Sequence, residues 1–350
     1  MGTKNQILVL TALAAFAATT APGPAEYPHP RGYVAIRTAS PPLVDGRLDD
    51  PAWRDAPWTA DFVDMADASA SPAPRTRVKM VWDDQALYMA ADIAEPRLWA
   101  EMTKHDAPLY QENAFEFFID PDGDNHEYYE FEINALNTTW DLLLPRPYRD
   151  GGLGISNWEI AGLQSAVHLD GTLNDPSDVD RGWSIEIAVP WKALGEQARR
   201  PSPPHEGDQW RMNFTRVETA LRVDNGRYRK IDGQASQVSS WAPQYVMDIH
   251  RPETWGYVQF ERTVSPFVSD PAWPARRWLH AVYYAERDYR KLHGRWSAGL
   301  AELGVQPPGD GLADPAIETT TDLFEVSVTL PRTGSAAERW HIRQDGRIWK

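Results

Sequence analysis

Alternating hydrophobic and polar positions recur along this chain, most clearly in residues 105–144. Three runs there, residues 115–119, 129–133 and 140–144, place hydrophobic side chains at every second position. Successive side chains of a β-strand point to opposite faces, so each run can bury one face and present the other. Residues 120–125, Asp-Pro-Asp-Gly-Asp-Asn, separate the first two runs and favour a turn. The pattern predicts an antiparallel meander with an apolar back and a front that carries carboxylates and amides.

The same alternation predicts further short strands on both sides of the meander, at residues 75–82, 87–93, 182–190, 210–215 and 255–260. Many short strands joined by turns, with little helix between them, are typical of a β-sandwich. We therefore predict an all-β, antiparallel β-sandwich over residues 35–262. The proline-rich residues 22–34 are predicted to form a linker before it.

After the sandwich the hydrophobic spacing becomes helical. Intervals of three and four indicate an amphipathic helix at about residues 275–293, ended by Gly294. The apolar stripe consists of Trp278, Val282, Ala285, Tyr289, Leu292 and Trp296. Short strands are predicted at residues 322–330 and 339–348. Residues 270–350 are therefore expected to form a small C-terminal α+β extension, which we interpret as a packing or partner-facing unit.

Composition narrows the class of ligand. The formal net charge is −15 at pH 7, which argues against nucleic acid, because phosphate binding needs clustered Lys and Arg. It argues equally against an anionic membrane surface. The chain has no cysteine, which excludes disulfides, thiolate metal sites, c-type haem attachment and an N-terminal lipid anchor. Sixteen tryptophans in 350 residues suit an aromatic-rich core or a sugar-stacking surface.

Residues 1–21 are predicted to be a secretory signal peptide. Lys4 supplies the positive charge, residues 7–18 form the apolar core, and small residues at 15–17 and 19–21 are cleavage candidates. This apolar run is shorter than the ~20 residues of a transmembrane helix. We therefore expect export to the periplasm or the cell exterior, without membrane insertion.

Several segments, in their order and spacing, carry a family resemblance. They are residues 44–49 with Trp53, 81–84 with 87–88, 113–120, 131–136, 182–191 and 255–256. Together they span about residues 40–260 and resemble the family 9 carbohydrate-binding modules, a DOMON-like β-sandwich family. They more closely resemble stand-alone exported proteins called carbohydrate-binding family 9-like. The resemblance implies an antiparallel sandwich, often with structural calcium. It also implies a non-catalytic module, attached in studied members to glycan-degrading enzymes, that grips sugar ends between two aromatic rings.

Carried onto this sequence, the resemblance assigns one clamp ring and a set of polar partners. The ring falls at Tyr110, and Glu132 stands where the family has an arginine. The second ring is expected near residues 249–250, where this sequence has no tryptophan; Trp241 and Trp255 are possible substitutes. The implied carbohydrate-binding set is Tyr110, Glu112, Asn113, Glu116, Glu132, Asn134, Trp241 and His250.

The residue types in this set suit sugar recognition. An aromatic ring stacks on the C–H face of a sugar, with a gain on the scale of other ring contacts, ~1 kcal/mol. Carboxylates accept hydrogen bonds from hydroxyl groups, and amides both donate and accept them, in fixed geometry. The alternative interpretation is the solvated polar face of a half-buried sheet, which antiparallel sheets commonly have.

The loop at residues 120–125 offers a metal site. Asp120, Asp122 and Asp124 bring several carboxylate oxygens into a short segment, as calcium prefers. The alternative is a hairpin turn that uses Asp and Gly for backbone reasons. A second acidic loop lies at residues 174–180. We expect no cofactor other than a structural calcium ion.

The sequence thus predicts an exported, non-catalytic carbohydrate-binding protein that binds an oligo- or polysaccharide and assists its degradation or uptake. One alternative is a glycoside hydrolase, with a carboxylate pair drawn from Glu116, Glu130 and Glu132 at the ~5–9 Å separation that such enzymes use. Another is a b-type haem domain. The candidate haem ligands are Met80, Met89, Met102 and His105.

Overall fold

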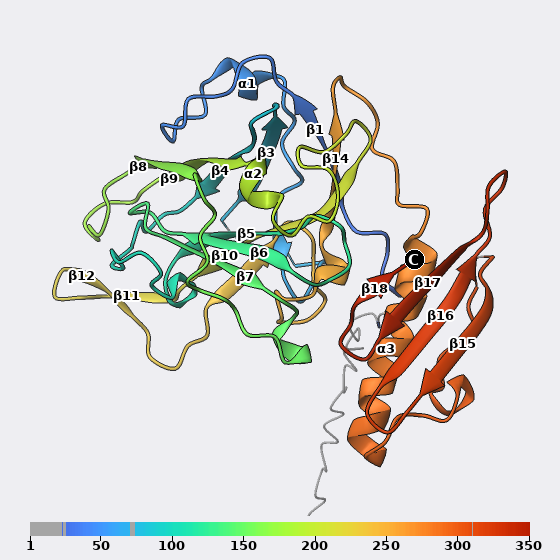
Figure 1. Ribbon diagram of the computed structural model, residues 1–350. Coiled ribbons are helices and arrows are strands. Elements are labelled where there is room, and N and C mark those ends of the chain that lie inside the picture. Colours follow the sequence, from blue (N-terminus) through green and yellow to red (C-terminus); the bar gives the residue numbers. More distant parts are fainter. Residues whose placement is uncertain (1–22, 24–25, 71–73, 310) are drawn as a thin grey trace, which may run out of the picture.

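The computed structural model describes residues 23, 26–70, 74–309 and 311–350 (Figure 1). The predicted signal peptide at residues 1–21 lies outside the described residues. Two units follow each other along the chain, a β-rich body and a smaller C-terminal unit of one long helix against a sheet (Figure 1). No helix in the described part of the chain is both long and apolar enough to cross a bilayer.

The body is built mainly from short strands. They are β1 (Gly32–Arg37), β2 (Val63–Asp64), β3 (Thr76–Trp82), β4 (Ala86–Ala94), β5 (Ala114–Asp120), β6 (Tyr128–Ile133), β7 (Thr139–Leu144), β8 (Gln164–Asp170), β9 (Gly182–Pro190), β10 (Gln209–Glu218), β11 (Leu221–Asp224), β12 (Arg227–Lys230), β13 (Gln237–Ser240) and β14 (Gly256–Glu261). The short helical segments between them are α1 (Pro51–Arg54), η2 (Leu109–Gln111), η3 (Tyr148–Asp150), α2 (Trp191–Leu194) and η4 (Pro252–Thr254).

Most strands belong to one sheet that folds into a β-sandwich. Its order is β7-β6-β5-β10-β14-β1-β3-β4-β9-β8, with β13 joining β10 to β2. The predicted sandwich is confirmed, with one difference in strand direction. β1 runs parallel to both β14 and β3. β1 begins at Gly32, inside the segment predicted as a linker, because Gly32 and Val34 pair with β14.

The main core lies between the two halves of this folded sheet. Phe115, Phe117 and Phe131 from β5 and β6 belong to the same buried cluster as Met80 and Ile187 from the other half. This burial confirms the predicted apolar back for β5 and β6. On β7 the prediction was wrong, because Trp140 and Leu142 lie opposite Glu132 and Glu130, and Leu143 enters the main core instead. The other face of β5, β6 and β7 therefore points away from the main core, and it carries the candidate site.

The C-terminal unit has its own core. Helix α3 (Trp273–His293) lies against a four-stranded antiparallel sheet of β15 (Ala313–Thr319), β16 (Phe324–Leu330), β17 (Glu338–Arg343) and β18 (Ile348–Trp349), with η5 (Leu300–Glu302) between them. The helix ends at Gly294 as predicted, because this residue adopts φ 70°, a left-handed conformation that glycine favours. Leu292 is exposed, and Trp296 lies beyond the helix, so the predicted stripe is two residues too long. Strand β15 was not predicted, since its proline interrupts the alternation, as edge strands allow.

The two units are joined through the turn between β5 and β6. Asn125 donates from Nδ2 to the Gly346 carbonyl at 2.9 Å, and Arg347 Nε donates to Asp124 Oδ2 at 2.8 Å. Arg276 of α3 donates to the Gly123 carbonyl at 2.7 Å. The turn predicted from its Asp and Gly residues therefore also anchors the C-terminal unit.

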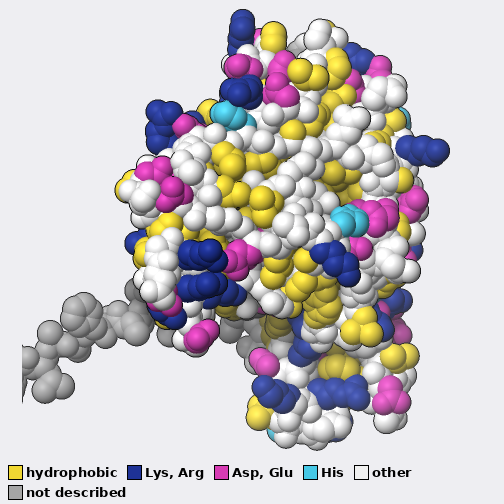
Figure 2. Space-filling model, turned by 90° about the vertical axis from the view of Figure 1, so that its left-hand side faces the viewer, with side chains coloured by type: hydrophobic (Ala, Val, Ile, Leu, Met, Phe, Trp, Pro, Cys, Tyr) yellow, Lys and Arg dark blue, Asp and Glu magenta, His cyan; other side chains and the backbone are white. Residues whose placement is uncertain are grey.

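Figure 2 shows the face on the side of β8, β9, β11 and β12. Hydrophobic side chains reach the surface in its middle, and charged side chains of both signs lie mostly toward its edges (Figure 2). On this face the net negative charge is not gathered into one patch.

Candidate functional site

Three glutamates share the outward face of β5 and β6. Glu116 on β5 pairs with Glu132 on β6, and Glu130 lies two residues before Glu132 on the same face. The sequence pattern placed these carboxyl groups on one side correctly, but both interpretations of that side expected it to be exposed. The structure instead buries all three side chains almost completely, because the segment at residues 241–255 crosses this face.

That covering segment is fixed by side chains of the sheet. Asn213 on β10 exchanges two hydrogen bonds with the Ala242 backbone, at 3.0 and 2.9 Å. Further along, the Trp255 ring packs against Phe118 and Tyr128, with ring centroids 5.4 and 5.0 Å apart. An apolar cluster therefore seals one part of the face, and the carboxyl groups lie beside it.

The three carboxyl groups have no cationic neighbour that neutralises them. Burial raises the pKa of Glu116 to about 7. Burial, and then repulsion from Glu116, raise the pKa values of Glu130 and Glu132 well above the ordinary range. None of the three forms an ion pair with a described side chain, whereas the buried glutamates Glu95 and Glu253 do. Burial therefore favours the protonated form of these carboxyl groups, and a protonated carboxyl group both donates and accepts hydrogen bonds.

Part of this hydrogen-bonding capacity is unused within the protein. Glu132 Oε2 accepts from the Tyr110 backbone at 2.7 Å, and Glu116 Oε2 accepts from the Thr215 hydroxyl. Glu116 Oε1 and Glu130 Oε2 are buried and have no partner among the described residues. A buried oxygen without a partner is costly, so these two atoms are candidates for contact with a ligand hydroxyl or a water molecule.

Two exposed tyrosine rings lie at the margin of the carboxyl cluster. Tyr110 in η2 is 49% exposed and lies beside Trp140 of β7, with ring centroids 6.0 Å apart. Tyr148 in η3 is 45% exposed. Its pKa is raised to about 12 by partial burial and then by the charges of Glu130, Glu132 and Tyr110. The charges of the carboxyl cluster therefore reach the Tyr148 hydroxyl group.

Tyr148 is the functional candidate that the sequence interpretation missed. Its ring meets His250 edge to face, with centroids 4.6 Å apart, so it lies where the second clamp ring was expected. A Cβ atom at Gly154 would lie 2.9 Å from the Tyr148 hydroxyl oxygen. The absence of a side chain at Gly154 therefore leaves room for the Tyr148 ring. The only sequence signal was an aromatic residue in the Pro-Tyr-Arg-Asp-Gly turn after β7.

His250 packs against the Tyr148 ring and is itself held in place. Its Nδ1 lies 2.9 Å from the Tyr128 hydroxyl, and its ring packs edge to face on Phe118. Burial, and then the charge of Arg149, lower the pKa of His250 to about 3. A neutral, half-buried imidazole here positions Tyr148 and does not act as a charged ligand group.

The remaining predicted residues lie elsewhere. Trp241 is buried in the main core, where its ring fills the space beside Gly256, so it is not a clamp ring. Asn134 Nδ2 donates to Glu112 Oε1 at 2.6 Å, and Glu112 also accepts from the Glu101 backbone at 3.0 Å. These two residues shape the loop that carries Tyr110. Asn113 Oδ1 accepts from the Thr219 backbone at 2.8 Å, which is also a structural role.

The Asp120 turn retains the features expected of a cation site. The carboxylate oxygens of Asp120, Asp122 and Asp124 lie within 4.8 Å of one another. Asp120 is fully buried, and burial, followed by the charges of the other two, raises its pKa well above the ordinary range. Its two oxygens accept from the backbones of Gly123 and Asn125, both at 2.9 Å. The all-oxygen donor set fits a calcium ion, and Arg347 of the C-terminal unit provides one positive charge to it.

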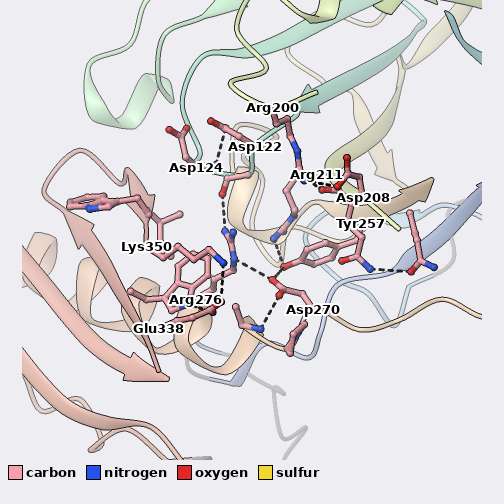
Figure 3. Close-up of a pocket in the computed structure, with 18 of the residues that line it drawn as sticks. Asp122, Asp124, Arg200, Asp208, Arg211, Tyr257, Asp270, Arg276, Glu338 and Lys350 are labelled. Carbon is pink, nitrogen blue, oxygen red and sulfur yellow. Dashed lines mark hydrogen bonds and ion pairs between the residues drawn. The ribbon is translucent and has the colours of Figure 1, made fainter. Parts of the chain in front are cut away.

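A polar cleft of about 870 Å³ lies between the two units next to this turn (Figure 3). Its charged residues come from both units and are of both signs (Figure 3). Arg211 donates to Tyr257 and to three backbone carbonyls, and Arg276 pairs with Asp270 at 3.2 Å. These two arginines already bind other residues of the protein, so we interpret the cleft as a polar contact region between the units.

The structure places the residues proposed for the two alternative chemistries. Met80 and Met89, proposed as haem ligands, are buried in the main core and serve packing. The three glutamates proposed for glycoside hydrolysis form one buried cluster in which every pKa is raised.

Comparisons with known proteins agree on one family. The profile of the carbohydrate family 9 binding domain-like family matches residues 44–259. An exoglucanase from Acetivibrio thermocellus is 29% identical over 163 residues, which are 46% of this chain and 12% of that enzyme. An endo-1,4-β-xylanase from Thermoanaerobacterium saccharolyticum is 26% identical over 161 residues, again 46% of this chain and 12% of the enzyme. The chain thus spans about an eighth of these relatives.

Solved structures give weaker similarity. A family 9 carbohydrate-binding module from Caldicellulosiruptor kristjanssonii in complex with cellotriose has 16% sequence identity and a TM-score of 0.44, and covers 68% of this chain and 100% of that one. A putative carbohydrate-binding protein from Bacteroides uniformis has 17% identity and a TM-score of 0.49, with coverages of 66% and 100%.

Proposed function

Because the chain belongs to the carbohydrate family 9 binding domain-like family, we propose that it binds a neutral oligosaccharide on the outward face of β5, β6 and β7. One observation carries this proposal. Tyr110 and Tyr148, two exposed rings, lie beside buried carboxyl groups that no described cation neutralises. Rings supply stacking surfaces, and protonated carboxyl groups supply hydroxyl partners.

The family match favours binding over hydrolysis. The model that matches residues 44–259 describes a carbohydrate-binding domain, and the two enzymes match this chain over only 12% of their own length. We therefore propose a non-catalytic role, in which the protein holds a polysaccharide while other enzymes degrade it. The names of the relatives suggest β-1,4-linked glucan and xylan as the first ligands to test. We also propose that the protein acts outside the cytoplasm.

The test is a binding screen followed by calorimetry. We expect a panel of cello- and xylo-oligosaccharides to contain a ligand, and Tyr110→Ala to abolish its binding. Tyr110→Phe is the matched control, because it keeps the ring, and we expect it to retain binding. Reducing-sugar release by the purified protein, lost in Glu132→Gln, would contradict the non-catalytic role. Equal affinity of Tyr110→Ala and the parent protein would place the site elsewhere.

We also propose that the Asp120 turn holds a structural calcium ion. The support is the set of three carboxylates within 4.8 Å, which includes the fully buried Asp120. A bound ion at a hundred times its dissociation constant would add about 2.7 kcal/mol to the free energy of unfolding. We expect a chelator to lower the melting temperature of the parent protein but not of Asp122→Asn. An unchanged melting temperature would leave the segment as a turn that docks the C-terminal unit.

A further inference from the structure

A second cluster of metal-ligating side chains lies on the other face of β7. His105, Asp106, Asp141 and Glu159 each direct one ligand atom to a common point, and these atoms lie within 4.8 Å of one another. They come from three segments: the loop before η2, β7 itself, and the stretch after η3. Packing of the sandwich, and not local sequence, therefore brings them together.

The orientation of the imidazole is fixed by the backbone. His105 Nδ1 lies 2.9 Å from the Thr139 carbonyl oxygen. A carbonyl oxygen only accepts, so Nδ1 carries a hydrogen. The Nε2 atom then faces Glu159 Oε1 at 3.1 Å and Asp106 Oδ1 at 3.4 Å. Metal-binding histidines show this arrangement, with one ring nitrogen held by a backbone carbonyl and the other turned to the ion.

Asp141 gives an independent indication of a ligand. Its side chain is only 6% exposed, and one oxygen, Oδ2, accepts from the Ile160 backbone. The other oxygen, Oδ1, accepts no hydrogen bond from any residue that the structure describes, and it points at His105 Nε2 from 4.0 Å. A cation beside Nε2 would bind this oxygen together with the imidazole.

The spacing of the ligand atoms fits a small divalent ion. Bonds of ~2.0–2.2 Å from zinc to nitrogen and oxygen place neighbouring ligand atoms about 3.0–3.6 Å apart. The distances from Nε2 to Glu159 and Asp106, 3.1 and 3.4 Å, already lie in this range. His105 and Glu159 are about half exposed, so an ion can enter from solvent. One imidazole with three carboxylates suits a first-row transition ion better than calcium, which prefers oxygen alone.

We propose that His105, Asp106, Asp141 and Glu159 bind a divalent transition-metal ion of the zinc class. The ion would fasten residues 101–113, the loop that carries Tyr110, to β7. The Asp106 backbone already donates to the Thr139 carbonyl at 3.0 Å, so the loop lies in place before the ion enters. This site is separate from the calcium site at the Asp120 turn and goes beyond the proposed sugar binding.

The test is metal titration of the full-length, untagged protein after chelator treatment. We expect calorimetry to show one zinc ion per chain that His105→Gln and Glu159→Gln each weaken about tenfold or more. Cobalt should give a visible absorption band that His105→Gln removes. The matched control is His341→Gln, because His341 is paired with Glu325 at 2.7 Å but lies on the C-terminal sheet.

Three results would overturn the proposal. A parent protein that binds no zinc would leave an ion-pair cluster only. Zinc binding equal in His105→Gln and the parent protein would exclude the imidazole as a ligand. Zinc binding that Asp122→Asn abolishes, while His105→Gln leaves it intact, would place the ion at the Asp120 turn. Melting curves of each variant show whether a loss reflects unfolding.

Discussion

The buried glutamates at the junction of the two units and on the sheet face differ in what surrounds them. At the junction of the two units, Glu253 accepts from Arg149 at 2.9 Å and from Arg251 at 3.0 Å. Burial raises the pKa of Glu253, but these two arginines lower it more, so the carboxylate stays ionised. On the sheet face, Glu116, Glu130 and Glu132 are as deeply buried, and no described arginine or lysine pairs with them.

The comparison distinguishes a carboxylate that stabilises the fold, at the junction, from carboxyl groups that are available to bind a ligand, on the sheet face. The junction glutamate, Glu253, accepts hydrogen bonds from Arg149, Arg251 and the Tyr284 hydroxyl, so its oxygens are already occupied within the protein. The face glutamates keep buried oxygens without a partner in the described chain, below two exposed rings. Burial alone therefore says little about role. What matters is whether the protein itself satisfies the carboxyl oxygens or leaves them available to a ligand.

The largest expected effect lies at the junction. Glu253→Gln leaves the buried Arg251 without its carboxylate partner and removes one of the three carboxylates around Arg149. Breaking a buried pair costs about 3–5 kcal/mol of unfolding free energy. Denaturant unfolding measures this loss. Glu130→Gln is the matched control on the face, and we expect it to change stability by less than about 1 kcal/mol. Equal losses in the two variants would remove the distinction between the regions.

The next effect concerns the ring that sequence analysis missed. We expect Tyr148→Ala to weaken oligosaccharide binding about fivefold to tenfold, the loss of one stacking contact of ~1 kcal/mol. Tyr148→Phe should bind nearly as well as the parent protein, and both variants should melt at the parent temperature. Calorimetric titration with the tightest oligosaccharide measures this. Full binding by Tyr148→Ala would show that the clamp has one ring only.

The pH dependence of stability should have opposite sign in the two regions. The pKa of Glu116 is about 7 in the folded protein, against an ordinary value of 4.5. Between these values the folded state binds more protons than the unfolded state, so this group makes the unfolding free energy fall as pH rises from about 4.5 to 7. The lowered pKa of Glu253 acts in the opposite sense, and its contribution is lost as pH falls below 4.5.

Glu116→Gln isolates the first of these contributions. We expect unfolding free energies measured at pH 5, 6, 7 and 8 to fall less steeply in this variant than in the parent protein. Glu253 stays ionised throughout this range, so it contributes no slope. Parallel profiles for the two proteins would show that Glu116 ionises at its ordinary pKa.

The smallest expected effect tests how Tyr148 is held. A Cβ atom at Gly154 would lie 2.9 Å from the Tyr148 hydroxyl oxygen and 2.8 Å from Leu142 Cδ1. We expect Gly154→Ala to move the ring and to reduce oligosaccharide affinity about twofold to threefold, a fraction of ~1 kcal/mol. In the background of Tyr148→Ala the same change should have no further effect. A further loss there would mean that Gly154 acts through another residue.

The sequence predicted the strands and the face that holds the glutamates, because a period of two determines which side chains share a side. It did not show what covers that face. The burial of Glu116 and Glu132 depends on residues 241–255, which are far away in the chain. Tyr148 lies in a turn without periodicity, and Trp241 looked available because a tryptophan after a strand can be core or surface. These outcomes are decided by tertiary packing.

The central claim is that a saccharide lies between Tyr110 and Tyr148, above the uncompensated carboxyl groups. A crystal structure of the protein with its tightest oligosaccharide tests this most directly. We expect a sugar ring against both tyrosines, with a hydroxyl group within hydrogen-bond distance of Glu130 or Glu132. A sugar bound in the cleft between the two units, with the rings of Tyr110 and Tyr148 uncovered, would contradict the account.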